Sequence, residues 1–175
     1  MAPEKKAKKA PPKGGIKKGS AVRAMKEVLG GDARLSENAA VRAIMEAESC
    51  LRHIAKHCKA ALQIAGKKTL TLTILLSVLE AQNAKKHVLL AAQSGSTEKK
   101  RKEDRNVIAT ASVLRVVKKE LGDARISASA ADALAHIAGA VLQKLASGAE
   151  LIARNDNRST VKKRDVDTYL ELGVC

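Results

Sequence analysis

A six-residue pattern that occurs twice constrains this chain more than any other feature. The sequence GDARLS at residues 31–36 returns as GDARIS at residues 122–127, a spacing of 91 residues. The same spacing, carried forward without a gap, aligns Leu51 with Leu142. Because coincidence does not easily hold a register over such a length, the two halves of the chain are predicted to be copies of one structural unit.

Each copy has the residue pattern of a short helix, a long helix and a second short helix, which predicts an all-α fold. In the first copy Ser20 is the expected cap of the first helix, and Ser36 or Asn38 opens the long one. The predicted helices are 20–29, 36–65 and 70–82 in the first copy, and 110–121, 127–155 and 161–172 in the second. A helix of about 30 residues, roughly 45 Å long, cannot bury its apolar stripe alone. The two copies are therefore expected to pack against each other within the chain.

Composition divides the chain into four segments. Residues 1–19 contain seven lysines, three prolines and three glycines, and are predicted to be a disordered, DNA-binding tail. Residues 20–93 and 106–175 hold the two copies. The charged residues 94–105 between them are predicted to be a linker, either a solvated connector or a further DNA contact. The tail lysines proposed to contact DNA are Lys5, Lys6, Lys8 and Lys9.

The charge balance and the shortage of aromatic residues narrow the class of partner. The net charge of +15, from 33 Lys and Arg against 18 Asp and Glu, indicates a polyanion. Tyr169 is the only aromatic residue, which argues against modules that stack bases on aromatic rings. No apolar stretch could span a bilayer, and an odd set of three cysteines suggests a reducing compartment. A soluble protein, intracellular or enclosed in a particle, is expected, with no membrane partner.

The sequence carries no clear sign of catalysis. Glu46-Ala47-Glu48 has the pattern of a solvated helix face rather than of a catalytic carboxylate pair. No Gly-rich phosphate loop and no nucleophile motif occurs. Neither an enzyme nor a small-molecule substrate is therefore expected.

One cluster of cysteines and histidines has to be weighed as a metal site. Cys50, His53 and His57 would share one face of the long helix, with Cys58 next to them, and such residues can bind zinc or copper. The remaining candidates are scattered, at His87, His136 and Cys175. Cysteines on an aliphatic stripe are more often small buried residues. Core packing is the favoured interpretation, without a metal or another cofactor.

Over about residues 20–172 the chain resembles the histone fold, and two copies in one chain resemble the histone doublets of large DNA viruses. The most specific segment is RSTVKKRD at residues 158–165, where the resemblance implies a structural ion pair between Arg158 and Asp165. The first copy has Lys67 and Ile74 at the corresponding positions, so its loop must be held differently.

The resemblance also implies a subtype for each half. Residues 84–88 resemble the extra C-terminal helix of histone H2B, which favours an H2B-like first half and a truncated H2A-like second half. The Arg-Ser-Thr loop of the second half is itself H2B-like. The Arg-hydrophobic-Ser pattern at 34–36 and 125–127 also looks like that of histones, in which this arginine enters a minor groove and the helix N-terminus meets a phosphate.

Independently of the family, a head-to-tail pair of such units places the first loop of one half beside the second loop of the other. Each end then combines a helix N-terminus with arginines and lysines, a suitable site for phosphate. Structural caps or surface ion pairs are the alternative roles for these side chains. The residues predicted to contact DNA, besides the tail lysines, are Arg34, Ser36, Lys67, Lys68, Thr69, Arg125, Ser127, Arg158, Ser159 and Thr160.

These features favour a structural DNA-packaging protein, equivalent to one histone dimer, that wraps double-stranded DNA together with other core histones such as a second doublet. Chromatin would be its location, in a virion or in a nucleus or viral factory if the chain is viral. The alternative is a histone-fold factor that regulates transcription, and a third hypothesis is an RNA-binding protein of ribosomal type. The basic tail and loops favour packaging, because regulatory factors usually add acidic or Gln-rich segments.

Overall fold

The computed structural model of the chain describes residues 15–97 and 108–172. The predictions for the four tail lysines, for most of the linker and for Cys175 lie outside the described residues. The elements are α1 (Lys18–Lys26), β1 (Arg34–Leu35), α2 (Glu37–Ile64), β2 (Thr69–Leu70), α3 (Leu72–Ala81), α4 (Lys86–Thr97), α5 (Thr110–Leu121), β3 (Arg125–Ile126), α6 (Ala128–Asn155), β4 (Thr160–Val161) and α7 (Lys163–Glu171). In the described part of the chain, no helix is long and apolar enough to cross a membrane.

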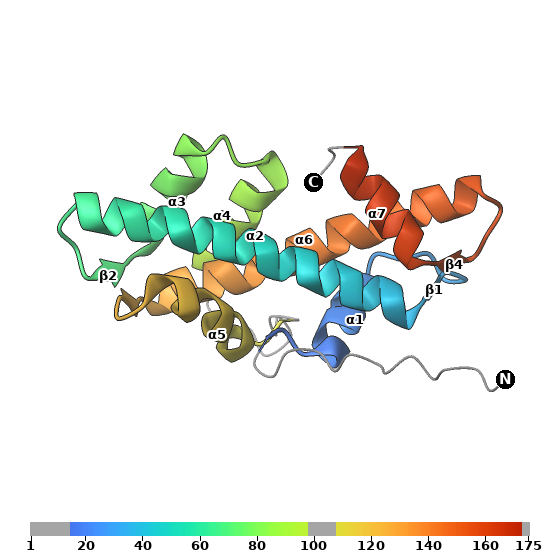
Figure 1. Cartoon of the computed structure of the whole chain (residues 1–175), viewed down its shortest axis with the longest axis horizontal. Helices are drawn as coiled ribbons and strands as arrows, with labels where there is room; N and C mark the ends of the chain where they lie inside the picture. Colours follow the sequence, from blue (N-terminus) through green and yellow to red (C-terminus); the bar gives the residue numbers. More distant parts are fainter. Residues whose placement is uncertain (1–14, 98–107, 173–175) are drawn as a thin grey trace, which may run out of the picture.

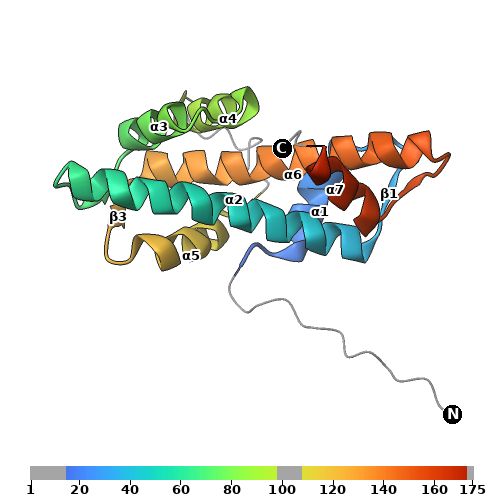
Figure 2. The ribbon, with the colours of Figure 1, turned by 45° about the horizontal axis from the view of Figure 1, so that its top comes forward.

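The two long helices, α2 and α6, organise the molecule (Figure 1). In this view α1 and α5 lie below the pair of long helices, and α3 and α7 lie above it. Each half contacts the other, because α5 packs on α2 and α1 packs on α6. Figure 2 shows α4 beside α3, and α4 also packs along α6. The predicted all-α fold of two tandem short-long-short units, packed together within one chain, is confirmed.

One aliphatic core connects the two halves. Leu51 of α2 and Leu142 of α6, which are equivalent in the repeat, are both completely buried and belong to the same cluster. Tyr169 of α7 also enters this core, because Gly148 of α6 leaves room where a methyl group would run into the tyrosine ring. Neither half completes its core without the other.

The long helices begin and end where their local sequence predicts. Ser36 caps α2, and its side-chain oxygen accepts a hydrogen bond from the Ala39 amide at 3.3 Å. Ser127 caps α6 in the same way, accepting from the Ala130 amide at 3.2 Å. Such caps satisfy amides that have no partner within the helix. After α2, the chain turns at Gly66, whose φ of +63° favours glycine.

The prediction that Ser20 caps the first helix was wrong. The helix α1 begins at Lys18, so Ser20 lies within it, and Lys17 occupies the cap position without a side-chain hydrogen bond. A tertiary contact fixes this start: Ile16 is buried, and its amide donates to the Glu48 side chain on α2 at 2.8 Å. The helix also ends at Lys26, earlier than expected.

The same contact corrects the interpretation of Glu46 and Glu48 as a solvated pair. Glu48 is only 7% exposed and accepts a hydrogen bond from the Ile16 amide, while Glu46 is half-buried and pairs with Arg42 at 3.0 Å.

Two further helices, α3 and α7, begin two residues later than predicted, because Leu70 and Val161 belong to short strands instead.

Candidate nucleic-acid interface

At one end of the molecule, the first loop of the first half lies beside the second loop of the second half. Strand β1 pairs in parallel with β4, so that Arg34 is opposite Thr160. The Arg34 amide donates to the Ser159 carbonyl at 2.8 Å, and the Ser36 amide donates to the Val161 carbonyl at 3.0 Å. These backbone bonds fix Arg34 against the loop that carries Arg158, Ser159 and Thr160.

The opposite end repeats this arrangement with the roles of the halves exchanged. Strand β2 pairs in parallel with β3, so that Thr69 is opposite Arg125. The Arg125 amide donates to the Lys68 carbonyl at 2.9 Å, and the Ser127 amide donates to the Leu70 carbonyl at 3.0 Å. The head-to-tail pairing of loops expected from the repeat is thus confirmed at both ends.

A long helix starts at each end, directly after the paired strand. The first amides of a helix point outward along its axis, and the helix dipole makes this end partly positive. The caps Ser36 and Ser127 each bind one of these amides, and their neighbours Glu37 and Ala128 open the helices. Each end therefore offers backbone N–H groups next to an arginine, an arrangement that suits a phosphate oxygen.

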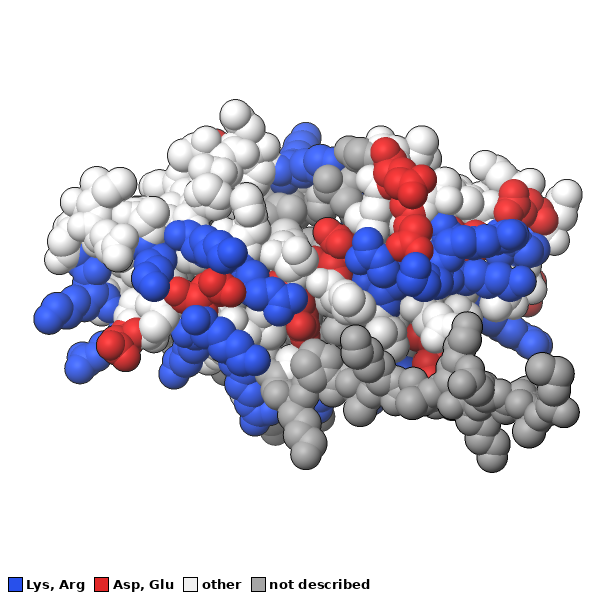
Figure 3. All heavy atoms as spheres, in the orientation of Figure 1, with Lys and Arg blue, Asp and Glu red and all other residues white. Residues whose placement is uncertain are grey.

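Basic side chains gather at the same two ends. Figure 3 shows them toward both extremes of one face, over β2 and α5 and over β4 and α7. At the β2–β3 end Lys67, Lys68 and Arg125 are exposed, and at the β1–β4 end Arg34 is exposed. None of these four side chains forms an ion pair with another described residue. They are available to an external anion.

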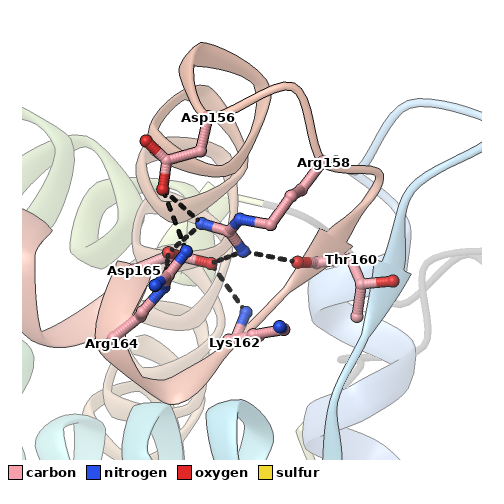
Figure 4. A network of polar contacts seen from close by, with 6 residues as sticks. All are labelled: Asp156, Arg158, Thr160, Lys162, Arg164 and Asp165. Carbon is pink, nitrogen blue, oxygen red and sulfur yellow. Dashed lines mark hydrogen bonds and ion pairs between the residues drawn. The ribbon is translucent and has the colours of Figure 1, made fainter.

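Arg158 is placed differently, because its guanidinium is held by acidic partners (Figure 4). It donates to both carboxylate oxygens of Asp165, at 2.7 and 3.0 Å, and to Asp156 at 2.8 Å. It also donates to the Thr160 carbonyl at 3.1 Å, and the Lys162 amide donates to Asp165 at 2.7 Å. Arg158 and Asp165 thus form a two-pronged ion pair that closes the loop before α7.

The electrostatics of this pair favour the charged state of both partners. Burial of Asp165, which is 1% exposed, would by itself raise its pKa, but the hydrogen bonds from Arg158 and the Lys162 amide outweigh burial and leave the pKa below its ordinary value. The hydrogen bonds to Asp165 and then Asp156 raise the pKa of Arg158. Arg158 therefore stabilises the loop, and among Arg158, Ser159 and Thr160 only Ser159 is exposed.

Three basic residues at this end were absent from the predicted site. Lys162, Lys163 and Arg164 are all exposed beside β4, although Arg164 pairs with Asp156 at 3.1 Å and Lys163 with Asp167. The run of three basic residues immediately after Val161 is the sequence signal that could have predicted their place in the site.

At the other end Lys67 is exposed and Ile74 is half-buried, so an ion pair of the Arg158–Asp165 kind does not form there.

The cysteines and histidines of α2 divide between core and surface. Cys58 is completely buried, and burial raises the pKa of its thiol to about 12. His53 and His57 lie at the surface with their Nε2 atoms 3.1 Å apart. Among the described residues, no group of three or more His, Cys, Asp or Glu is arranged to hold a metal ion.

Part of the chain is similar to a known protein family, and its fold is similar to that of a solved structure. The family model of the core histone H2A/H2B/H3/H4 domain matches residues 91–172, a range that contains α5, α6 and α7. The solved structure of the histone from Methanopyrus kandleri is similar, with a TM-score of 0.64 and 22% sequence identity, over 88% of this chain and 92% of that one. No curated protein matches the sequence. The chain is thus an all-helical protein built of two tandem histone folds, and its residues 91–172 match the core histone domain.

Proposed function

We propose that this chain is a structural DNA-packaging protein, equivalent to a histone dimer in one polypeptide, that binds duplex DNA without reading its sequence. The observation that carries the proposal is the pair of equivalent ends, each with parallel strands, a helix N-terminus and exposed cations. Arg34 marks one end and Arg125 the other. The proposed contacts also include Ser36, Lys67, Lys68, Thr69, Ser127, Ser159, Thr160 and the tail lysines.

The spacing of the two ends suits a DNA duplex. They lie near the two termini of α2, which has 28 residues and is therefore about 42 Å long. One turn of DNA is about 34–36 Å, so phosphates on the same side of a duplex recur at a comparable distance. Two anchoring points at this spacing favour contact with one face of the duplex, and a bend of the DNA around the protein between them.

The chemistry of the ends favours binding that is independent of sequence. Lysine, arginine and helix-terminal amides contact phosphates, which are the same in every sequence. Arginines inserted into the minor groove also bind without discriminating among bases. Arg158 has a positioning role in this proposal, because its ion pair with Asp165 supports the loop that faces Arg34.

The match to the core histone domain supports assembly with other histones, and we include a second two-unit chain of this type among the partners. The likeness to viral histone doublets, the division into an H2B-like and an H2A-like half, and a location in chromatin of a virion, nucleus or viral factory belong to the same proposal. Each follows from the resemblance of residues 20–172.

Competition binding tests the proposal. A labelled duplex bound to the full chain is challenged with unlabelled duplexes of random and of varied defined sequence, at several salt concentrations. We expect equal competition by all duplexes. We also expect a slope of log affinity against log salt at least as steep as about −3.6, from the four unpaired loop cations at about 0.9 each. Strong preference for one sequence would contradict packaging and favour a regulatory factor.

A further inference from the structure

Two imidazole rings on the surface of α2 lie unusually close together. His53 and His57 are one helical turn apart, their ring centroids are 4.5 Å apart, and their planes meet at 66°. Their Nε2 atoms are separated by 3.1 Å. In a neutral pair, one ring donates an N–H···N hydrogen bond from its Nε2 and the other ring accepts it. When both rings carry their proton on Nδ1, the two Nε2 lone pairs are instead free to bind one metal ion.

The distance between the two nitrogens fits a metal ion. With metal–nitrogen bonds of about 2.0–2.1 Å, two ligands at a right angle have nitrogens about 2.9 Å apart, and two at the tetrahedral angle about 3.3–3.4 Å. The observed 3.1 Å lies between these values. We propose that His53 and His57 form a binding site for a divalent transition-metal ion of the zinc and copper class.

The surroundings leave room for such an ion. Both histidines line a cavity of about 430 Å³ whose walls come from α2, α3, α4 and the turn between α3 and α4, α6 and α7. Cys50 and His87 line the same cavity, as does Glu46, which is already paired with Arg42. His53 is exposed and His57 half-exposed, so an ion can reach the pair from solvent.

The expected site is an exchangeable one. Structural zinc sites use four protein ligands, whereas no group of three candidate ligands is arranged around an ion among the described residues. Two imidazoles from the protein and water molecules from solvent complete the coordination. The site also lies on the side of the long helices that carries α3 and α7, away from α1 and α5 (Figure 1), so it is separate from the loop pairs at the two ends.

Calorimetric titration of the full chain with Zn²⁺, without DNA and with its cysteines kept reduced, tests the proposal. We expect a zinc-binding event that is weakened at least tenfold by His53→Asn and by His57→Asn. The matched control is His136→Asn, on α6 and outside the cavity, which should bind Zn²⁺ like the parent chain. Circular dichroism of each variant checks that the helices are retained, which the surface position of the two rings leads us to expect.

Two results would overturn the assignment. The first is the absence of zinc binding by the parent chain at millimolar Zn²⁺, or binding that is equal in the parent and in both histidine variants. The second is binding that is lost in Cys50→Ser but kept in both histidine variants, which would assign the ion to the thiolate instead.

Discussion

Leu51 of α2 and Leu142 of α6 occupy equivalent places in the two repeats, and both are completely buried in one core. Truncating a fully buried leucine to alanine removes apolar contacts and leaves a cavity, at a cost of about 3 kcal/mol. A urea dependence of about 2 kcal/mol per molar converts this cost into a midpoint that is lower by about 1.5 M. Because the core is shared, Leu51→Ala and Leu142→Ala should each lower the midpoint of the same single transition.

Urea unfolding followed by circular dichroism is the assay. Ile64→Ala is the control, since this side chain is 89% exposed and its truncation should change the free energy of unfolding by no more than about 0.5 kcal/mol. Two resolved transitions, of which Leu51→Ala shifts one and Leu142→Ala the other, would show that the halves are independent domains. That outcome would refute the shared core.

Three further predictions follow from single residues. The pKa of Asp165 is lowered in the fold, so its carboxylate stabilises the protein above its unfolded-state pKa, and this contribution is lost as the pH falls through the folded-state value. Asp165→Asn should therefore reduce the dependence of stability on pH below about pH 4, and an unchanged acid profile would contradict the Arg158 ion pair. Cys58, with a pKa of about 12, should resist alkylation at pH 8 in the native protein and react after denaturation, as mass spectrometry of the labelled chain would show. Gly148→Ala should destabilise the chain in thermal unfolding because the added methyl meets Tyr169; stabilisation by about 1 kcal/mol, the usual gain in a helix, would show that the ring is not packed there.

The features that the sequence predicts well are those determined locally or by the repeat. Ser36 and Ser127 cap the long helices because a serine before an apolar periodic stretch satisfies a helical amide wherever it occurs. The pairing of Arg34 with the second half and of Arg125 with the first follows from symmetry, since two equivalent half-cores must combine head to tail.

The features that the sequence does not predict depend on contacts between residues that are far apart along the chain. The start of α1 is set by the Ile16 amide on Glu48, 32 residues away, and no local pattern marks that glutamate as buried. Leu70 and Val161 look helical from their neighbours, and they become strand residues only because another loop pairs with them. The closeness of His53 and His57 depends on side-chain rotamers, which spacing alone does not fix.

The most direct test of the proposed DNA-binding ends is the salt-dependent affinity of Arg34→Ala/Arg125→Ala for a random duplex, compared with that of Lys8→Ala/Lys9→Ala. Both variants lose two positive charges, so counterion release alone predicts equal losses. Arg34 and Arg125 are held by paired strands beside helix N-termini, and we expect their removal to weaken binding at least tenfold more, about 1.4 kcal/mol, while circular dichroism shows an unchanged helical content. Equal losses in the two variants would contradict the assignment of these two ends as the DNA contacts.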